Sequence, residues 1–387
     1  MSEASGAPRQ TVEVVRAGPE HAGAMAEFFR ATWSPGSTAE RVLQSRAEEA
    51  RSNPGGGGEE PPTFLWLADG KVLGYVSTIP GRIRTASGEH RAHWMKGLMV
   101  LPEHRNGPIG FMVLKEAVRS LGCTLSIAAA APALRLFKAL GFQDLGPIPN
   151  RLRVLEPGRL FAELDVERLG LRGLPIWVPD AVNIARGFGV SALVGFYGKT
   201  LTGGWQLFSR HRGRRLETGS LATPEEFDAL WKALEGSIAG SPVRDSAYLG
   251  WRYDWSEGGE YRLATVREGE RLAGFAVIRE PRKAGDPRLA GIRLAVLSEF
   301  VFDPAAPGSG DALLRAVDRT ARNLEADAIL CSATHSKALP VLHRRGYLKI
   351  PGNIHLLQRD PGGECALPET LGDWWVTRGD GDADEAL

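Results

Sequence analysis

The 387-residue sequence has few cysteines, almost no net charge and no long apolar run. Its three cysteines, Cys123, Cys331 and Cys365, are widely spaced and form no CxxC pair, which argues against a disulfide framework or a zinc site and fits a reducing cytoplasm. Lys and Arg total 47 against 46 Asp and Glu, so the net charge of +1 supplies no field that recruits nucleic acid or anionic membrane. We therefore expect no metal, no nucleic acid and no membrane among the partners.

Segments for export or membrane insertion are also missing from the sequence. The opening residues, MSEASGAPRQ, are polar and lack the apolar core of a signal peptide. The most apolar region, residues 174–198, is interrupted by Pro175, Pro179, Asp180 and Arg186. It therefore fails the test of about 20 consecutive apolar residues for a membrane span. Packing against another domain is the simpler interpretation, and we expect a cytoplasmic protein.

The most informative stretch that is present covers residues 97–119, GLMVLPEHRNGPIG followed by FMVLKEAVR. An apolar run ends in a turn holding Arg105, Gly107 and Gly110, and the turn opens directly into a segment with helical apolar spacing. The first amides of a helix have no partner within it, and together with the positive end of the helix dipole they attract an anion. The junction therefore predicts a site for a phosphate or pyrophosphate.

This turn resembles the coenzyme A pyrophosphate loop of the GNAT N-acyltransferase superfamily, in which an apolar strand leads to Arg or Gln and then to spaced glycines. Val100, Pro102, Arg105 and Gly110 match that pattern, whereas Pro108 stands where the family usually has its first glycine. The resemblance continues through a strand at 124–130 and a helix at 131–142 that closes in Gly-Phe. An ordinary βαβ unit with a glycine-bearing turn is the alternative.

The element order predicts an α/β protein with a mixed sheet, of α+β type. A strand at 11–17, a helix at 19–33, a hairpin at 63–83 with an Asp-Gly turn, and the central strand at 92–101 precede the turn. A last pair of strands around 143–155 would complete one domain. By its resemblance this is a GNAT domain, covering residues 10–156.

The second half of the chain repeats this plan, which indicates duplication. It has a hairpin at 260–280, a central strand at 292–304, a glycine-bearing loop and a helix at 311–324, and Gly310 lies 200 residues after Gly110. We expect two tandem GNAT-like domains. The bounds are 10–156 for the first and 211–360 for the second, with an inter-domain helical segment at 157–210 and a C-terminal tail at 361–387.

The two loops differ in ways that favour the first as the coenzyme site. The first keeps Arg105, whereas the second keeps Gly308 and Gly310 but has Ala305 at the Arg position and Asp311 just after the glycines. An aspartate about 4 Å from a pyrophosphate costs roughly 1–4 kcal/mol through like-charge repulsion. We therefore expect the second copy to be a scaffold that shapes the acceptor site.

The resemblance implies that acetyl-CoA or another acyl-CoA is the co-substrate. Its pantetheine arm would pair with the backbone of Leu98, Met99 and Val100 like an added strand. Its pyrophosphate would be flanked by Arg105 and held by four amides, those of Asn106, Gly107, Ile109 and Gly110. The reaction would be attack of a neutral acceptor amine on the acyl thioester, which needs a general base and a donor for the oxyanion.

Motifs do not identify the catalytic groups. The family's usual acid is a tyrosine four residues before the closing glycine, and these positions hold Phe137 and Leu342. A thiol pKa near 8.5 makes thiolate a competent leaving group without that acid. Candidates for the base are His93, Glu103, Glu299 and His335; each also has a structural interpretation, as a hydrogen-bonded histidine, a turn cap or an ion-pair member.

The C-terminal tail and the acceptor stay open in the sequence. Trp374 and Trp375 stand among Asp373, Asp380, Asp382 and Asp384, which suits stacking on a sugar or amine, although two anchoring tryptophans are the simpler interpretation. The leading hypothesis is transfer of an acyl group, acetyl in the first instance, to a small-molecule amine such as an amino sugar or an amino-acid-like metabolite. The alternatives are a Fem-type aminoacyl transferase and a non-catalytic acyl-CoA-binding or assembly module.

Overall fold

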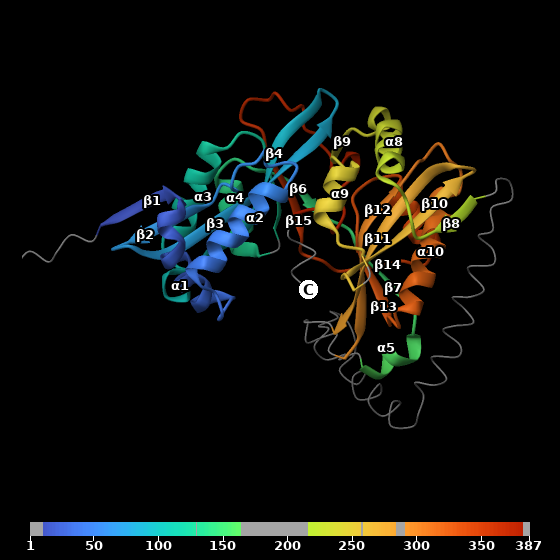
Figure 1. Cartoon of the computed structure of the whole chain (residues 1–387), viewed down its shortest axis with the longest axis horizontal. Helices are drawn as coiled ribbons and strands as arrows, with labels where there is room; N and C mark the ends of the chain where they lie inside the picture. The colour runs from blue at the N-terminus through green and yellow to red at the C-terminus, as the bar shows by residue number, and fades with distance from the viewer. Residues whose placement is uncertain (1–10, 129, 164–215, 257, 284–290, 382–387) are drawn as a thin grey trace, which may run out of the picture. The chain divides into compact units, whose positions relative to one another are not determined.

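The computed structural model describes residues 11–128, 130–163, 216–256, 258–283 and 291–381, and they form two compact units (Figure 1). Unit 1 comprises Met1–Pro147 and Asn353–Glu369; unit 2 comprises Ile148–Gly352 and Thr370–Leu387. Most of the expected inter-domain helical segment, 164–210, lies outside the described residues. Its described beginning is helical, as α5 (Pro157–Glu163).

Unit 1 contains the elements expected of the first domain, together with one strand from the end of the chain. In order these are β1 (Val12–Arg16), η1 (Pro19–His21), α1 (Ala22–Thr32), α2 (Ala39–Ser52), β2 (Phe64–Ala68), β3 (Lys71–Thr85), β4 (Gly88–Val100), η2 (Pro102–His104), α3 (Ile109–Ser120), β5 (Thr124–Ala128), α4 (Ala131–Ala139), β6 (Gln143–Pro147) and β15 (His355–Arg359). The predicted Asp-Gly turn joins β2 to β3, with φ of 49° at Asp69 and 79° at Gly70. Thr38 caps α2 by accepting the Arg41 amide at 3.3 Å.

The sheet of unit 1 runs in the order β1-β2-β3-β4-β5-β15-β6, and only its β4/β5 pair is parallel. Alternation along the strands sends apolar side chains to both faces. One face packs Val76, Met95 and Leu98 against α3 and α4. The other face packs Tyr75 and Met99 with α1 and α2. The strand that leads into the predicted turn thus lies between two packed faces, while the turn itself is largely exposed.

Unit 2 repeats this arrangement. Its elements after β7 (Asn150–Val154) and α5 are β8 (Leu216–Gly219), α8 (Pro224–Leu234), η3 (Glu235–Ser237), β9 (Gly240–Pro242), α9 (Ser246–Arg252), β10 (Tyr261–Glu268), β11 (Arg271–Lys283), β12 (Arg293–Phe302), α10 (Ser309–Asn323), β13 (Ala328–Ser332), α11 (Ala338–Arg344), β14 (Leu348–Ile350) and η5 (Leu371–Asp373). The sheet order is β14-β7-β13-β12-β11-β10-β8, and its β12/β13 pair is parallel. A capping box between Thr223 and Glu226 begins α8.

One expectation about the strands is wrong. The pair predicted around 143–155 does not stay together: β6 belongs to the first sheet, whereas β7 pairs with β13 and β14 in the second. In return β15, from the end of the second repeat, lies between β5 and β6. The unit bounds therefore differ from the expected ranges 10–156 and 211–360, and the expected tail 361–387 is divided between the two units at Thr370.

Matching glycines in the two sheets support the duplication. Gly74 pairs with Val100 at the end of β4, and Gly274 pairs with Phe302 at the end of β12. A Cβ at Gly74 would lie 2.4 Å from the Ile109 side chain, and one at Gly274 would lie 2.9 Å from the Val301 carbonyl oxygen. Both positions need close approach of backbone and neighbour, so each repeat uses glycine at the same place.

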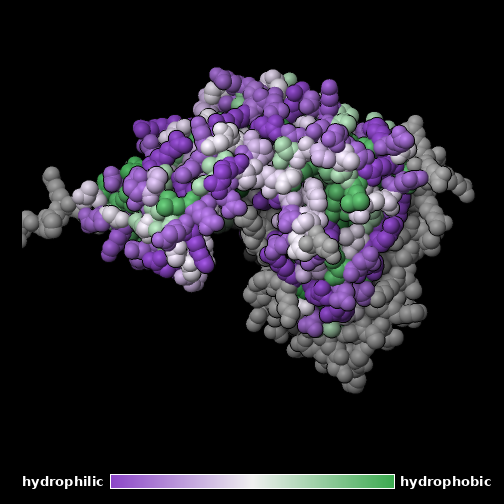
Figure 2. Space-filling model, viewed as in Figure 1, coloured by the Kyte–Doolittle hydropathy of each residue, from purple (hydrophilic) through white to green (hydrophobic). Residues whose placement is uncertain are grey.

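Exposed large apolar side chains are few among the described residues. Figure 2 shows a mainly hydrophilic face with scattered hydrophobic areas. The exposed large apolar side chains are dispersed in the sequence: Val12, Trp33, Leu43, Met112, Leu221 and Leu348. Among the described residues, no helix is long and apolar enough to cross a membrane. The three cysteines are free and buried.

Candidate functional site

The central feature of unit 1 is the point where β4 separates from β5. The two strands pair at only two positions, His93 with Thr124 and Trp94 with Leu125. Beyond them β4 continues to Val100, paired on one side with β3, while β5 pairs on its other side with β15. No strand of the described residues pairs with the open side of β4 from Met95 onward. We call this opening the unit 1 fork; its unpaired strand edge can accept an extended ligand as an added strand.

A bulge interrupts β4 inside the unit 1 fork. Gly97 and Leu98 together oppose the single residue Val76, because Lys96 pairs with Ser77 and Met99 pairs with Tyr75. Gly97 has a φ of 65°, and a Cβ there would lie 3.4 Å from the Tyr75 ring. A bulge redirects the backbone groups beside it, so the amides and carbonyls at Leu98 and Met99 are aimed differently from those of a regular strand.

The predicted anion-binding turn follows at the end of β4, as η2 and the start of α3. The Gly107 amide donates to the His104 carbonyl oxygen at 3.1 Å, so Gly107 does not offer the free N–H that we expected of it. Ile109 and Gly110 lie in the first turn of α3, where helical geometry supplies no acceptor for their amides. Pro108 is the N-cap with φ −78° and ψ −6°, a conformation that its ring favours. The turn thus retains the helix start, with fewer donors than the sequence suggested.

Arg105 lies over the end of β4. Its Nε donates to the Val100 carbonyl oxygen at 3.2 Å, and its Nη2 lies 3.7 Å from the Met99 sulfur. The side chain is exposed, as is that of Asn106. The guanidinium therefore stands beside both the strand end and the turn, where a cation would flank a bound diphosphate.

The position of the family's usual acid is filled by core residues in both units. Phe137 is buried and packs edge-on against Phe142, with ring centroids 4.8 Å apart. Leu342 is fully buried in the core of unit 2. Neither position supplies a proton donor.

The base candidates of unit 1 differ in their surroundings. His93 is buried at the closed end of the unit 1 fork, its amide donates to the Cys123 carbonyl oxygen at 3.0 Å, and its Nδ1 has no hydrogen-bond partner among the described residues. Burial, together with the charges of Arg91 and Arg16, lowers the pKa of His93 to about 4, so the ring is neutral at pH 7. Glu103 is exposed in η2.

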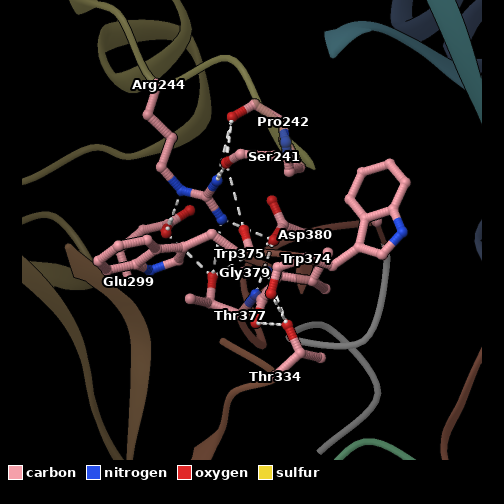
Figure 3. A network of polar contacts seen from close by, with 12 residues as sticks. Ser241, Pro242, Arg244, Glu299, Thr334, Trp374, Trp375, Thr377, Gly379 and Asp380 are labelled. Atoms are coloured by element: carbon pink, nitrogen blue, oxygen red, sulfur yellow. Dashed lines mark hydrogen bonds and ion pairs between the residues drawn. The ribbon is translucent and has the colours of Figure 1, made fainter. Parts of the chain in front are cut away.

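The two candidates of unit 2 are engaged in structural contacts. Glu299 is fully buried and accepts hydrogen bonds from Arg244 at 2.7 Å and from Thr377 at 2.9 Å (Figure 3). The Tyr253 hydroxyl also donates to Glu299, at 2.9 Å. His335 stacks on Trp375 with ring centroids 4.2 Å apart, and burial followed by the charge of Lys337 lowers its pKa to about 4. These contacts favour the structural interpretation of both residues.

The tail tryptophans anchor the chain. Trp374 and Trp375 are buried, which agrees with the simpler of the two interpretations. Asp380 joins the network of Glu299, because Arg244 also contacts its carboxylate at 2.7 Å (Figure 3). Asp382 and Asp384 lie outside the described residues.

Replacing Arg244 by alanine is expected to destabilise unit 2 by about 3–5 kcal/mol, because it leaves two buried carboxylates without their cation. Hydrogen exchange of β11 and β12 in the intact chain measures this loss. The matched control is Arg282→Ala on β11, which removes an exposed ion pair with Glu260 and should cost less than about 1 kcal/mol. If both variants lower the stability of unit 2 equally, the buried network stabilises it no more than an exposed ion pair does.

Asp380 makes the stability of unit 2 depend on pH. Burial raises the pKa of Asp380 to about 7 from 3.8, against the opposing effect of the Arg244 charge and with the help of the Glu299 charge. The folded protein thus keeps a proton that the unfolded chain releases near 3.8, so this contribution to stability is present below that pH and lost as pH rises to about 7.

We expect the wild type to lose stability relative to Asp380→Asn between about pH 5 and about pH 7, by up to about 1 kcal/mol per pH unit. Taking the difference between the two proteins cancels the opposite trend of His335. A difference that does not change with pH would show that Asp380 ionises normally.

Unit 2 keeps a cavity of about 440 Å³ at the loop that matches the anion-binding turn of unit 1. Gly308, Asp311, Lys337 and Arg344 are among its lining residues. The Asp311 carboxylate is buried and accepts a hydrogen bond from Arg344 at 2.9 Å. The Ala305 amide donates to the Asp303 carboxylate at 2.8 Å. The wall thus holds a carboxylate next to the first turn of α10, and this carboxylate is paired with Arg344, one of the two cations that line the cavity.

Two buried polar residues of β5 were not among the candidates predicted from the sequence. Thr124 and Ser126 are buried, and the Thr124 hydroxyl has no hydrogen-bond partner among the described residues. Their signal is visible in TLSIA, where two hydroxyl residues alternate with apolar ones in an otherwise apolar strand. In the described part of the chain, no group of three His, Cys, Asp or Glu side chains is placed to hold a metal.

Comparisons with known proteins agree with this fold. Residues 24–142 match the Acetyltransferase (GNAT) family. No curated protein sequence matches the chain. A probable N-acyltransferase from Enterococcus faecalis V583, described as a conserved protein of unknown function, has a similar structure, with a TM-score of 0.54, 12% identity, and 90% of this chain and 72% of that chain covered.

Two further solved structures are similar at comparable levels. A GCN5-related N-acetyltransferase from Kribbella flavida gives a TM-score of 0.53 at 12% identity, covering 92% of this chain and 72% of that chain. The Saccharomyces cerevisiae N-myristoyltransferase with bound myristoyl-CoA gives 0.50 at 13% identity, covering 92% and 80%. At these identities the structures support the fold, while the family match covers the fork and turn of unit 1. Residues 24–142, which lie in unit 1, therefore match the GNAT acetyltransferase family, and the rest of the chain shares the fold of the solved N-acyltransferase structures.

Proposed function

We propose that unit 1 transfers an acyl group, acetyl in the first instance, from acyl-CoA to the amine of a small-molecule acceptor such as an amino sugar or an amino-acid-like metabolite. The observation that carries the proposal is the unit 1 fork, an open strand edge that leads directly to the first turn of α3. An extended pantetheine arm and a diphosphate need these two features side by side, the first for strand-like hydrogen bonds and the second for anion binding.

The coenzyme would lie along the backbone of Leu98, Met99 and Val100. Its diphosphate would meet the amides of Asn106, Ile109 and Gly110, with Arg105 beside it. Gly107 leaves this set, since its amide donates within the turn. The face that carries Met99 and Tyr75, under α1 and α2, and the face that carries Leu98, under α3 and α4, would form the two walls of the site.

The chemistry is direct attack of a neutral amine on the thioester carbonyl. The oxyanion of the tetrahedral intermediate needs an N–H donor, and the bulge at Gly97–Leu98 supplies redirected amides in the fork. Collapse of the intermediate expels thiolate, which a pKa near 8.5 permits without an acid at the Phe137 position.

Among the four candidates we propose His93 as the base, because it is the one that combines burial at the unit 1 fork with a ring nitrogen that has no partner among the described residues. A neutral imidazole accepts a proton from the acceptor's ammonium group, directly or through a bridging water, and so provides the neutral amine that attacks. Glu103 is exposed, and Glu299 and His335 are held by other side chains of unit 2.

The test is titration of the intact chain with acetyl-CoA by calorimetry, followed by mass spectrometry of an amine panel incubated with acyl-CoAs from acetyl to myristoyl. We expect saturable binding and a mass gain on at least one small amine. Binding without transfer to any amine would favour the non-catalytic module instead. Binding of tRNA with a steep dependence on salt would favour the Fem-type reaction. Absence of acyl-CoA binding would refute the proposal.

A further inference from the structure

The sheet of unit 2 has its own fork. β12 and β13 pair at four positions, from Leu294 with Ala328 to Leu297 with Cys331. β13 then ends at Ser332, whereas β12 continues to Phe302 and, like β4, contains a bulge, at Ser298. We call this opening the unit 2 fork.

The C-terminal segment, Thr370–Asp380, lies inside the unit 2 fork. On the β12 side, the Gly379 amide donates to the Ser298 carbonyl oxygen at 2.8 Å and the Trp375 indole N–H donates to the Phe300 carbonyl oxygen at 3.0 Å. On the other side, the Thr334 amide donates to the Val376 carbonyl oxygen at 3.1 Å. The segment therefore donates hydrogen bonds to one arm of the fork and accepts one from the other, as an added strand would.

Side-chain packing fixes the segment in this position. A Cβ at Gly379 would lie 2.0 Å from the Tyr253 hydroxyl and 2.8 Å from the Ser298 carbonyl oxygen, so glycine alone fits there. The Trp375 ring stacks on His335 on one side and packs edge-on against Phe302 at 5.5 Å on the other. Phe302 also lines the 440 Å³ cavity, so Trp375 packs against a residue of the cavity wall.

Charge complementarity adds a third constraint. Asp380 contributes one of the two carboxylates that hold the buried Arg244, and the other comes from Glu299 of β12 itself (Figure 3). Withdrawal of the segment would take Asp380 away from Arg244 and Thr377 away from Glu299, and only the pair of Arg244 with Glu299 would remain of this charge network. The segment is thus an integrated part of unit 2.

We propose that the C-terminal segment is a built-in occupant of the unit 2 fork, which takes the hydrogen bonds that an incoming pantetheine arm would need and closes unit 2 to acyl-CoA. This inference rests on the proposed function, because it assigns the coenzyme to unit 1. The chain accordingly binds one acyl-CoA. Unit 2 keeps the GNAT-like fold while its ligand groove is permanently filled by the protein.

The experiment combines calorimetry with hydrogen exchange on the full chain, using acetyl-CoA as the probe. We expect one acetyl-CoA per chain, strong protection of the amides at 375–379, and no change of that protection at saturating acetyl-CoA. Two acetyl-CoA per chain, or faster exchange of the segment on addition of acetyl-CoA, would overturn the proposal. If no acetyl-CoA binds at all, the proposed function fails. Protection of the segment from exchange would still show whether it occupies the unit 2 fork.

A pair of variants tests whether Gly379 holds the C-terminal segment in the unit 2 fork. Gly379→Ala should raise exchange of residues 370–381 by about 10- to 100-fold, because one or two buried hydrogen bonds are lost. Gly372→Ala is the matched control in the same segment, since its Cβ would meet only the Ser336 Cβ at 3.9 Å. Exchange of β11 and β12 shows whether the second sheet survives. If Gly379→Ala unfolds it, Trp375→Phe, which loses the bond to Phe300, repeats the test. Unchanged exchange in the substituted segment would overturn the proposal.

Discussion

Gly110→Glu is expected to weaken acetyl-CoA binding by about 5- to 1,000-fold, since like charges about 4 Å apart cost roughly 1–4 kcal/mol. Gly110 is buried in the first turn of α3, and a Cβ there would lie 3.4 Å from both Leu136 and Val100. A methyl group therefore fits in ordinary contact, whereas a carboxylate must turn toward the space proposed for the diphosphate. Calorimetric titration measures the change.

The control for this variant is Gly23→Glu. Gly23 lies in the first turn of α1, where a Cβ would meet nothing within 4 Å, so it adds the same charge at the start of a different helix. Gly110→Ala separates bulk from charge, and hydrogen exchange of α3 reports whether unit 1 stays folded. If folded Gly110→Glu binds acetyl-CoA as the wild type does, the diphosphate is not held at this turn.

His93→Gln is expected to lower kcat by about 10²- to 10⁴-fold, the range typical of a lost general base, with little change in the Kd for acetyl-CoA. Glutamine keeps a polar side chain of similar size at the buried site, and it cannot take up a proton. The separation of kcat from coenzyme binding distinguishes loss of a base from loss of the fork.

The matched control is His90→Gln on the same strand, where the ring bonds the Ser87 hydroxyl at 2.8 Å near the exposed end of the β3/β4 hairpin. It should leave kcat unchanged. A reduction of kcat by His90→Gln equal to that by His93→Gln would point to a general effect on β4. If His93→Gln keeps the wild-type kcat, His93 is not the general base and another group must fill that role.

Local signals predicted the elements well, and they failed on long-range pairing. The Asp-Gly turn and the apolar spacing after Pro108 each fix a short piece of backbone, and the structure places both where expected. β7 and β15 carry the same kind of five-residue strand pattern as their neighbours. Such a pattern shows which face is buried and does not name a partner about 200 residues away. Their exchange between the two sheets could not be predicted.

The candidate site shows the same division. Arg105, Gly110 and the strand before them were identified from composition and order, because a turn into a helix has local rules. The loss of the Gly107 amide depends on how tightly η2 winds, and one hydrogen bond decides it. The role of the tail depended on Gly379 meeting Tyr253 and Ser298, a contact between distant segments that no spacing in the sequence reports.

The exchanged strands impose an order on biosynthesis. β5 and β6 each pair with β15, so the first sheet stays open between them until residue 359 has left the ribosome. β7 emerges early and then waits for β13 and β14, synthesised more than 170 residues later. Nascent chains thus carry exposed edges through most of translation, a hazard for aggregation and a task for chaperones. Neither half of the gene encodes a complete sheet, so separation of the halves by recombination would yield two incomplete proteins.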